Sequence, residues 1–234
     1  MARAPWEITR EMFLSLDEVQ SLLAHVRERA QEGGTTAFLD RLIVEAMMFS
    51  GLRNSEFCRL RLADALVSEG RPMLRVVETK GEERTVYLPA EPGALIHEYI
   101  TSVRKELLPP EIHPDDPDGP LVLNERGRPF ERTGLYRRVV RILTAAGLGD
   151  RASVQLLRHT YGYLAYLRTG GNLLFVQRQL GHAHPMVTSI YAQFVDESYA
   201  ELAERVFGTG NREAPKPPER KLISAVEEFS SEFD

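Results

Sequence analysis

Residues 156–194 read "LLRHTYGYLAYLRTGGNLLFVQRQLGHAHPMVTSIYAQF" and contain several chemically informative side chains. Their apolar periodicity predicts helices over 154–169 and 173–180, and a further short helix is expected over 185–192. Arg158 falls inside the apolar part of the first of these helices, where an unpaired charge would be costly. Its position therefore favours a functional role over simple solvation.

The end of this block places two histidines and a tyrosine close together in sequence. His182 and His184 form an H-x-H pair, and Tyr191 follows nine residues after His182. No acidic or cysteine partner lies near the pair, so metal binding is not expected. A tyrosine is more often a core residue than a nucleophile, so Tyr191 alone does not define a site. His159 is expected to pack or to hydrogen-bond structurally, and the neighbouring tyrosines are expected to pack.

Basic residues are concentrated around and before this block. Residues 122–170 carry nine arginines against Glu125, Glu131 and Asp150, a net charge of +6 in a chain whose overall net charge is −5. A concentrated basic surface is the electrostatic signature of phosphate binding. Composition alone leaves open the alternative that these arginines simply solvate helix faces.

The N-terminal part of the chain predicts three helices. Ser15 and Glu18 form the capping box of the first helix, which ends at the glycine pair of "EGG". The second helix covers 36–49, is apolar around most of its circumference and is therefore expected in the core. A short third helix follows in "NSEFCRLRLADA".

The apolar period then changes from that of a helix to that of strands. In "PMLRVVETKGEERTVYLP", two runs rich in β-branched residues surround Lys80-Gly81, which predicts a β-hairpin. Further helices are expected over 92–107, 132–146 and 197–206. The expected fold class is therefore mainly α with a small antiparallel β-sheet (α+β).

Composition indicates a protein of the reducing cytoplasm with no membrane segment. The single cysteine, Cys58, cannot form an internal disulfide, and no apolar run approaches the length of a bilayer span. Residues 1–207 are expected to form one domain, followed by a polar, proline-rich linker and tail over 208–234. The apolar residues of the tail either fray or form a short helix that docks onto a neighbouring protomer of a homo-oligomer.

Four segments together resemble the catalytic domain of the tyrosine site-specific recombinases, which include phage integrases and Xer-type enzymes. They are "SGLRNSEFCRLRLADA", "ETKGEERTVYLP", "PLVLNERGRPFERTGLYRRVVRILTAAGL" and the block over 156–194. The similarity spans about residues 10–205, and its specificity lies in the joint order and spacing of the motifs. The resemblance implies the catalytic-domain fold of that family, and we expect the family's separate N-terminal core-binding domain to be absent.

The resemblance implies that Tyr191 is the nucleophile that breaks a DNA strand. Cleavage without a metal needs an oxygen nucleophile, positive charge on the phosphoryl oxygens and a proton for the leaving oxygen. A 3′-phosphotyrosyl link would retain the phosphodiester energy, so rejoining needs no ATP or other cofactor. A phenol, with a reference pKa of about 10, is also a better leaving group than an aliphatic alcohol.

The remaining roles implied by the resemblance fall on charged and polar residues. Arg53 and Arg158 would hold the non-bridging phosphate oxygens, because planar guanidinium groups give two-point contacts. His182 would donate a hydrogen bond to the same phosphate, and Lys80 would protonate the leaving 5′ oxygen. Glu56 would orient Arg53. These roles require Arg53 and Arg158 to meet, although Arg53 alone could be a surface ion pair and Lys80 a solvated turn.

One position departs from the family pattern. The residue three before the second arginine is usually histidine, and here it is Gln155. An amide can hydrogen-bond to a phosphate, but it cannot accept a proton near neutral pH. If the missing imidazole acts as a general base, its loss could cost about 10²- to 10⁴-fold in rate.

Double-stranded DNA is the partner that the resemblance implies. A catalytically weakened DNA-binding or regulatory protein and a type IB topoisomerase-like enzyme remain alternatives to a recombinase. The DNA site and the biological role, whether integration, resolution, transposition or inversion, stay open. The candidate DNA contacts are Arg126, Arg128, Arg132, Arg137 and Arg138.

Overall fold

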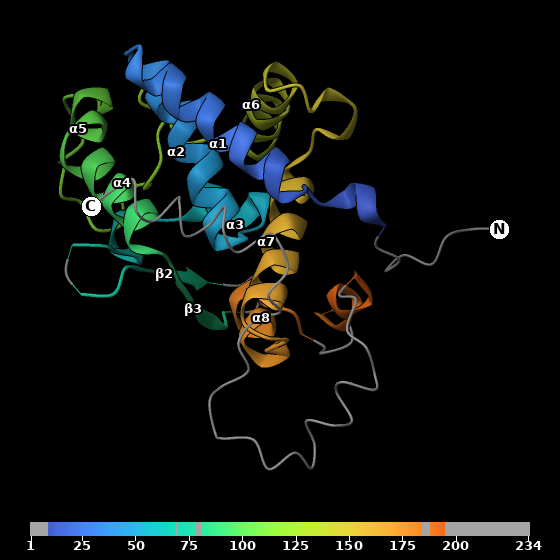
Figure 1. The fold of residues 1–234 in the computed structure, drawn as a ribbon. Coiled ribbons are helices and arrows are strands. Elements are labelled where there is room, and N and C mark those ends of the chain that lie inside the picture. Colours follow the sequence, from blue (N-terminus) through green and yellow to red (C-terminus); the bar gives the residue numbers. More distant parts are fainter. Residues whose placement is uncertain (1–8, 69, 78–80, 184–187, 195–234) are drawn as a thin grey trace.

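Helix α2 (Thr35–Ser50) lies at the centre of the fold and is buried along most of its length. In the computed structural model, which describes residues 9–68, 70–77, 81–183 and 188–194, this helix contacts α1, α4, α6 and α7 (Figure 1). The core positions are spread around the helix, in agreement with its nearly uniform apolar sequence. The predicted central helix is therefore confirmed.

The other elements follow one another closely along the chain. In order of sequence they are η1 (Arg10–Met12), α1 (Leu16–Gln31), α2, α3 (Asn54–Arg59), η2 (Leu62–Asp64), β1 (Ala65–Leu66), β2 (Met73–Val77), β3 (Glu83–Tyr87), α4 (Ala90–Thr101), α5 (Val103–Leu107), α6 (Arg132–Ala145), η3 (Gly149–Arg151), α7 (Val154–Arg168), α8 (Leu173–Leu180) and η4 (Ile190–Phe194). None of the helices in this described part has both the length and the apolar character that a membrane span requires.

The capping box predicted for α1 is present, and α2 ends at Gly51, which adopts a left-handed conformation. The Ser15 hydroxyl accepts a hydrogen bond from the Glu18 backbone, and the Glu18 carboxylate accepts one from Ser15. Gly51 closes α2 with φ of +63°, a left-handed conformation that favours glycine. The turn at Gly51 directs the chain straight into Arg53 and α3.

The predicted hairpin forms the larger part of a three-stranded antiparallel sheet. Strand β2 pairs with β3 in a register that places Leu74 opposite Val86, and both side chains are buried. The third strand, β1, contains two residues and was not predicted, because so short a segment shows no alternation of apolar and polar residues. Residues 78–80, including the Lys80 turn, lie outside the described part of the chain.

The predicted helix over 92–107 is wrong in one respect, because it is two helices. The backbone breaks at Ser102, with φ of −120° and ψ of −81°, between α4 and α5. The hydroxyls of Thr101 and Ser102 donate to the carbonyls of His97 and Glu98, one turn earlier. Side chains that bind the backbone in this way compete with helical hydrogen bonding and disturb a helix.

The C-terminal predictions are confirmed in part. Helices α7 and α8 match the predicted ranges. In the described portion of the predicted helix over 185–192, residues 188 and 189 are helical and residues 190–192 belong to the 3-10 turn η4. The predicted helix over 197–206 and the tail over 208–234 lie outside the described residues. With mainly helices and a small antiparallel sheet at their edge, the structure confirms the predicted α+β class (Figure 1).

Arg138, predicted to contact DNA, is instead buried between α6 and α2. Its Nε donates to Asp40 Oδ1 at 2.7 Å, its Nη1 to Glu125 Oε1 at 2.6 Å and its Nη2 to the Thr36 carbonyl at 2.9 Å. Arg141 contacts the same Asp40 carboxylate. Arg138 is buried where α6 packs on α2, and its acceptors compensate its charge. Its guanidinium is therefore unavailable to a phosphate.

We predict that Asp40→Ala destabilises the fold by about 3 kcal/mol, because it leaves buried Arg138 without one of its two carboxylate partners. Asp118→Ala is the matched control, since that carboxylate is exposed and pairs with the half-exposed Arg61. The control should change the free energy of unfolding by less than about 1 kcal/mol. Urea denaturation measures both, and equal effects would show that the Asp40 contact is not a stabilising one.

Candidate active site

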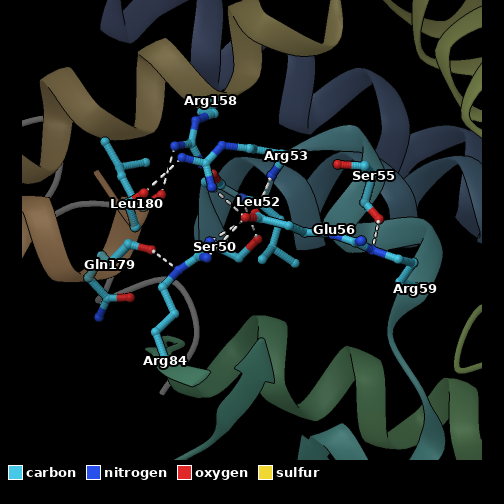
Figure 2. Close-up of polar contacts among 12 residues, drawn as sticks. Ser50, Leu52, Arg53, Ser55, Glu56, Arg59, Arg84, Arg158, Gln179 and Leu180 are labelled. Carbon is cyan, nitrogen blue, oxygen red and sulfur yellow. Dashed lines mark hydrogen bonds and ion pairs between the residues drawn. The ribbon is translucent and has the colours of Figure 1, made fainter. Parts of the chain in front are cut away.

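Arg53 and Arg158, far apart in sequence, converge at the C-terminal end of α8. Arg53 precedes α3, and its Nη2 donates to the Gly181 carbonyl at 2.8 Å. Arg158, in the second turn of α7, donates from Nη2 to the adjacent Leu180 carbonyl at 2.7 Å. Figure 2 shows the two side chains beside each other. The expected meeting of the two guanidinium groups is confirmed.

The two arginines differ in their exposure to solvent. The Arg53 side chain is 38% exposed, whereas Arg158 is 5% exposed and also donates to the Gly51 carbonyl. Burial, and then the charge of Arg53, lower the pKa of Arg158 to about 10, so it remains a cation at neutral pH. The backbone carbonyls hold Arg158 in place without neutralising it.

Glu56 orients Arg53, as the sequence predicted from their spacing of one helical turn. Its Oε1 accepts from Arg53 Nη1 at 2.6 Å, and its Oε2 accepts from the Arg53 backbone at 2.8 Å. Burial alone would raise the pKa of this carboxyl, but hydrogen bonds and positive charge from Arg84 and Arg53 lower it to about 2. Glu56 is therefore ionised throughout the physiological range.

Arg84 is a member of this cluster that the sequence analysis missed. It lies on β3, and its Nη1 and Nη2 donate to the two carboxylate oxygens of Glu56 (Figure 2). The alternation of β3 was an available signal, since a residue two positions before the buried Val86 shares its face of the sheet. Arg84 thus faces inward from a strand whose one other charged residue, Glu83, is exposed.

His182 lies immediately after the left-handed turn at Gly181 that ends α8. Its Nδ1 is 2.9 Å from the Thr188 hydroxyl, and its backbone is tied to Gln177. Burial, followed by the charges of Arg158 and Arg53, lowers the pKa of this imidazole to about 3. His182 is therefore a neutral ring close to both arginines, suited to donate a hydrogen bond from one nitrogen.

Tyr191 is fully buried against α7, with 1% of its surface exposed. Its hydroxyl lies 3.2 Å from His159 Nδ1, and its ring lies so close to Gly162 that a Cβ there would be 2.4 Å from Tyr191 Cζ. Burial raises the pKa of the phenol to about 12, although the charge of Arg158 opposes this. His159, expected to pack or to hydrogen-bond structurally, is thus the hydrogen-bonding partner of the candidate nucleophile.

Of the two other predicted site residues, the structure describes Gln155 and not Lys80. Gln155 is exposed on the first turn of α7, one turn before Arg158, and Lys80 lies outside the described residues. Among those residues, no three or more His, Cys, Asp or Glu side chains gather into a group that could hold a metal ion.

A basic surface begins beside the arginine cluster. The Asn54 amide of α3 donates to the Arg132 carbonyl at 2.9 Å, which ties the first residue of α6 to the helix that follows Arg53. Four of the five arginines predicted to contact DNA are exposed in and before α6, and the fifth is the buried Arg138. The exposed four are Arg126, Arg128, Arg132 and Arg137.

Comparison with known sequences shows the family to which this fold and this arginine cluster belong. The sequence profile of the phage integrase family matches residues 12–198. The chain belongs to the phage integrase family, and the resemblance seen in its motifs is confirmed.

Several relatives are tyrosine recombinases. XerC of Halalkalibacterium halodurans is 36% identical over 164 residues, which cover 70% of this chain and 52% of the relative. XerH of Helicobacter pylori is 30% identical over 197 residues, which cover 82% of this chain and 49% of the relative. The chain therefore spans about half the length of these relatives.

Solved structures confirm the fold. XerH in a pre-cleavage complex with its difH substrate superposes with a TM-score of 0.68 at 24% identity, over 86% of this chain and 55% of that chain. The catalytic domain of bacteriophage HP1 integrase superposes with a TM-score of 0.53 at 21% identity, over 86% of this chain and 98% of that chain.

We predict that the stability of the protein falls as the pH drops from 7 to 5.5. His159 and His182 have pKa values lowered to about 4 and 3, mainly by burial, whereas an unfolded histidine titrates near 6.5. The unfolded state therefore binds more protons below that value, and stability is lost as the pH falls. Solvent screening limits the loss to about 1 kcal/mol or less for each histidine.

Chemical denaturation at both pH values measures this effect. His159→Asn should reduce the pH dependence, because it removes one of the two titrations. His97→Asn, at an exposed position on α4, is the matched control and should leave the dependence unchanged. A free energy of unfolding that does not change between pH 7 and 5.5 would contradict the neutral, buried state of these rings.

Proposed function

We propose that this chain is the catalytic domain of a site-specific tyrosine recombinase, which cleaves and rejoins duplex DNA through a 3′-phosphotyrosyl intermediate. The observation that carries this proposal is the convergence of Arg53 and Arg158 on neighbouring carbonyls at the end of α8. Membership of the phage integrase family and similarity to XerC and XerH support it.

The arginine cluster suits the chemistry of phosphoryl transfer. A guanidinium has five N–H donors, and among the described residues Arg158 uses two nitrogens, Nη1 and Nη2, to bind carbonyls. The positive charge and fixed hydrogen bonds of Arg53 and Arg158 would stabilise the negative charge that a scissile phosphate beside them carries in the transition state. His182, Gln155 and Lys80 are proposed to contribute further donors, with Lys80 giving the proton to the leaving 5′ oxygen.

Tyr191 must change its surroundings before it can attack. Its hydroxyl is directed to His159, and the phenol is harder to ionise than in water because it is buried. We propose that DNA binding draws η4 away from α7, so that the phenolic oxygen reaches the phosphate near Arg158. His159, with a pKa lowered to about 4, is too weak a base to take the phenolic proton before attack, so this proton would leave to solvent as the new O–P bond forms.

The exposed arginines of α6 and of the loop before it are proposed to hold the DNA backbone. The link between Asn54 and Arg132 supports this, because it places the basic surface beside the arginine cluster.

Strand exchange between two sites would need several protomers, and residues 208–234 are proposed to form a linker and a tail that joins them. Such a protein would act on DNA in the cytoplasm.

A second candidate is a DNA-binding protein of the same fold with weakened catalysis. Gln155 in place of the usual histidine and the buried hydroxyl of Tyr191 favour it. The presence of Arg53, Arg158, His182 and Tyr191 together favours the enzyme.

We predict that the protein forms a covalent adduct with a nicked suicide DNA substrate, and that Tyr191→Phe abolishes the adduct. The phenolic oxygen is the proposed nucleophile, and phenylalanine keeps the ring that packs against Gly162. A denaturing gel detects the adduct. Tyr163→Phe is the matched control, because this tyrosine stacks on Phe13 instead of facing the arginines.

The outcomes separate the candidate functions. An adduct that persists in Tyr191→Phe would exclude Tyr191 as the nucleophile. Specific DNA binding without any adduct would favour the regulatory protein, and relaxation of arbitrary supercoiled plasmid would favour a topoisomerase-like enzyme.

We predict that DNA affinity falls steeply with salt, and that Arg132→Gln and Arg137→Gln each reduce the slope of log K against log salt concentration by about 0.9. Each substitution would remove one proposed phosphate contact. Arg29→Gln, exposed on α1, is the matched control and should leave the slope unchanged. Fluorescence anisotropy across a salt series measures the slopes, and a flat dependence in the unmodified protein would exclude the proposed basic surface.

A further inference from the structure

Arg84 connects three parts of the candidate active site. From β3, its Nη1 and Nη2 donate to Glu56 Oε1 and Oε2 at 2.9 and 2.8 Å, and its Nε donates to the Gln179 carbonyl at 3.2 Å. Its side chain is 11% exposed. A nearly buried guanidinium therefore binds both the helix that follows Arg53 and the end of α8 (Figure 2).

Three successive carbonyls at the end of α8 each accept one guanidinium. The Gln179 carbonyl accepts from Arg84, the Leu180 carbonyl from Arg158 and the Gly181 carbonyl from Arg53. The last carbonyls of a helix lack partners within the helix and carry its partial negative charge. Arg84 is thus held in the same row as the two arginines proposed to bind the phosphate.

Glu56 makes a second positive charge necessary. A carboxylate paired with Arg53 alone would neutralise the charge that the phosphate needs, and would draw the guanidinium toward itself. Arg84 supplies a second cation, so that Arg53, Glu56 and Arg84 together keep a net charge of about +1. Glu56 Oε1 accepts from Arg53 Nη1 and Arg84 Nη1 together, which means that the two arginines share one carboxylate oxygen.

We propose that Arg84 is a positioning residue for the cleavage reaction. It neutralises and fixes Glu56, so that the carboxylate orients Arg53 without cancelling its charge toward the scissile phosphate. This role rests on the proposed recombinase function. It requires no contact between Arg84 and the DNA.

A double-mutant cycle between Arg84 and Glu56 tests this role. The unmodified chain, Arg84→Ala, Glu56→Gln and the double variant are compared by the single-turnover rate of adduct formation on the nicked substrate, with DNA affinity measured in parallel. Arg84→Ala should slow adduct formation by roughly 10- to 100-fold, because Glu56 then competes with the phosphate for Arg53. The double variant should form the adduct at least about tenfold faster than Arg84→Ala, because the neutral amide of Gln at position 56 no longer competes with the phosphate for Arg53.

Other variants separate positioning from folding. Arg84→Lys should rescue only part of the rate, because an ammonium cannot bind both oxygens of Glu56 in a fixed geometry. Arg75→Ala is the matched control: it lies on the neighbouring strand and pairs with buried Asp64, outside the cluster. Its adduct rate should be unchanged, and the melting temperature of every variant shows whether it folds.

The result that overturns the inference is distinct from a failure of the proposed function. If the unmodified chain forms an adduct but the rate effects of Arg84→Ala and Glu56→Gln multiply within about twofold, the two residues act independently and Arg84 is not a positioning residue. If Arg84→Ala lowers DNA affinity but leaves the rate of adduct formation unchanged, Arg84 contributes to DNA binding instead of positioning Arg53. If the unmodified chain forms no adduct, the proposed function itself fails.

Discussion

The site depends on the row of backbone carbonyls at the C-terminal end of α8. Residues 179–181 each accept a hydrogen bond from an arginine on a different element: β3, α7 and the segment before α3. These carbonyls would otherwise be unpaired next to protein, and the arginines would otherwise be costly to bury. The carbonyls and the arginines satisfy each other's hydrogen bonding. The position of α8 therefore sets the spacing of the three guanidinium groups.

Helix α7 links Arg158, which is proposed to bind the phosphate, to the candidate nucleophile. Arg158 is directed to α8, and the next residue, His159, is directed to the hydroxyl of Tyr191. Gly162, one turn further on, leaves the space that the tyrosine ring fills. One helix therefore holds the positive charge and the phenol in a fixed relation, in a state where the phenol is protected from solvent. The same burial that stabilises this state raises the pKa of the phenol.

Arg138, away from the site, also shows that a buried arginine needs acceptors that compensate its charge. Arg138 is as buried as many apolar residues, and it is tolerated because Asp40, Glu125 and a backbone carbonyl surround it. Arg132 and Arg137, on the same helix, are exposed, and so is Arg141, although it also contacts Asp40. An arginine in a basic segment can therefore serve either DNA or the core, and its contacts decide which.

Local sequence determined the elements and the class of chemistry. The capping box, the apolar periods and the hairpin residues predicted most helices and both long strands, and the ordered motifs indicated Arg53, Glu56, Arg158 and His182. Tertiary structure alone decided that Arg84 joins them, that Arg138 is buried against Asp40 and that Tyr191 lies against His159. Helix and strand formation depends on neighbours within a few residues, whereas pairing and desolvation of charges depend on distances between elements remote in sequence.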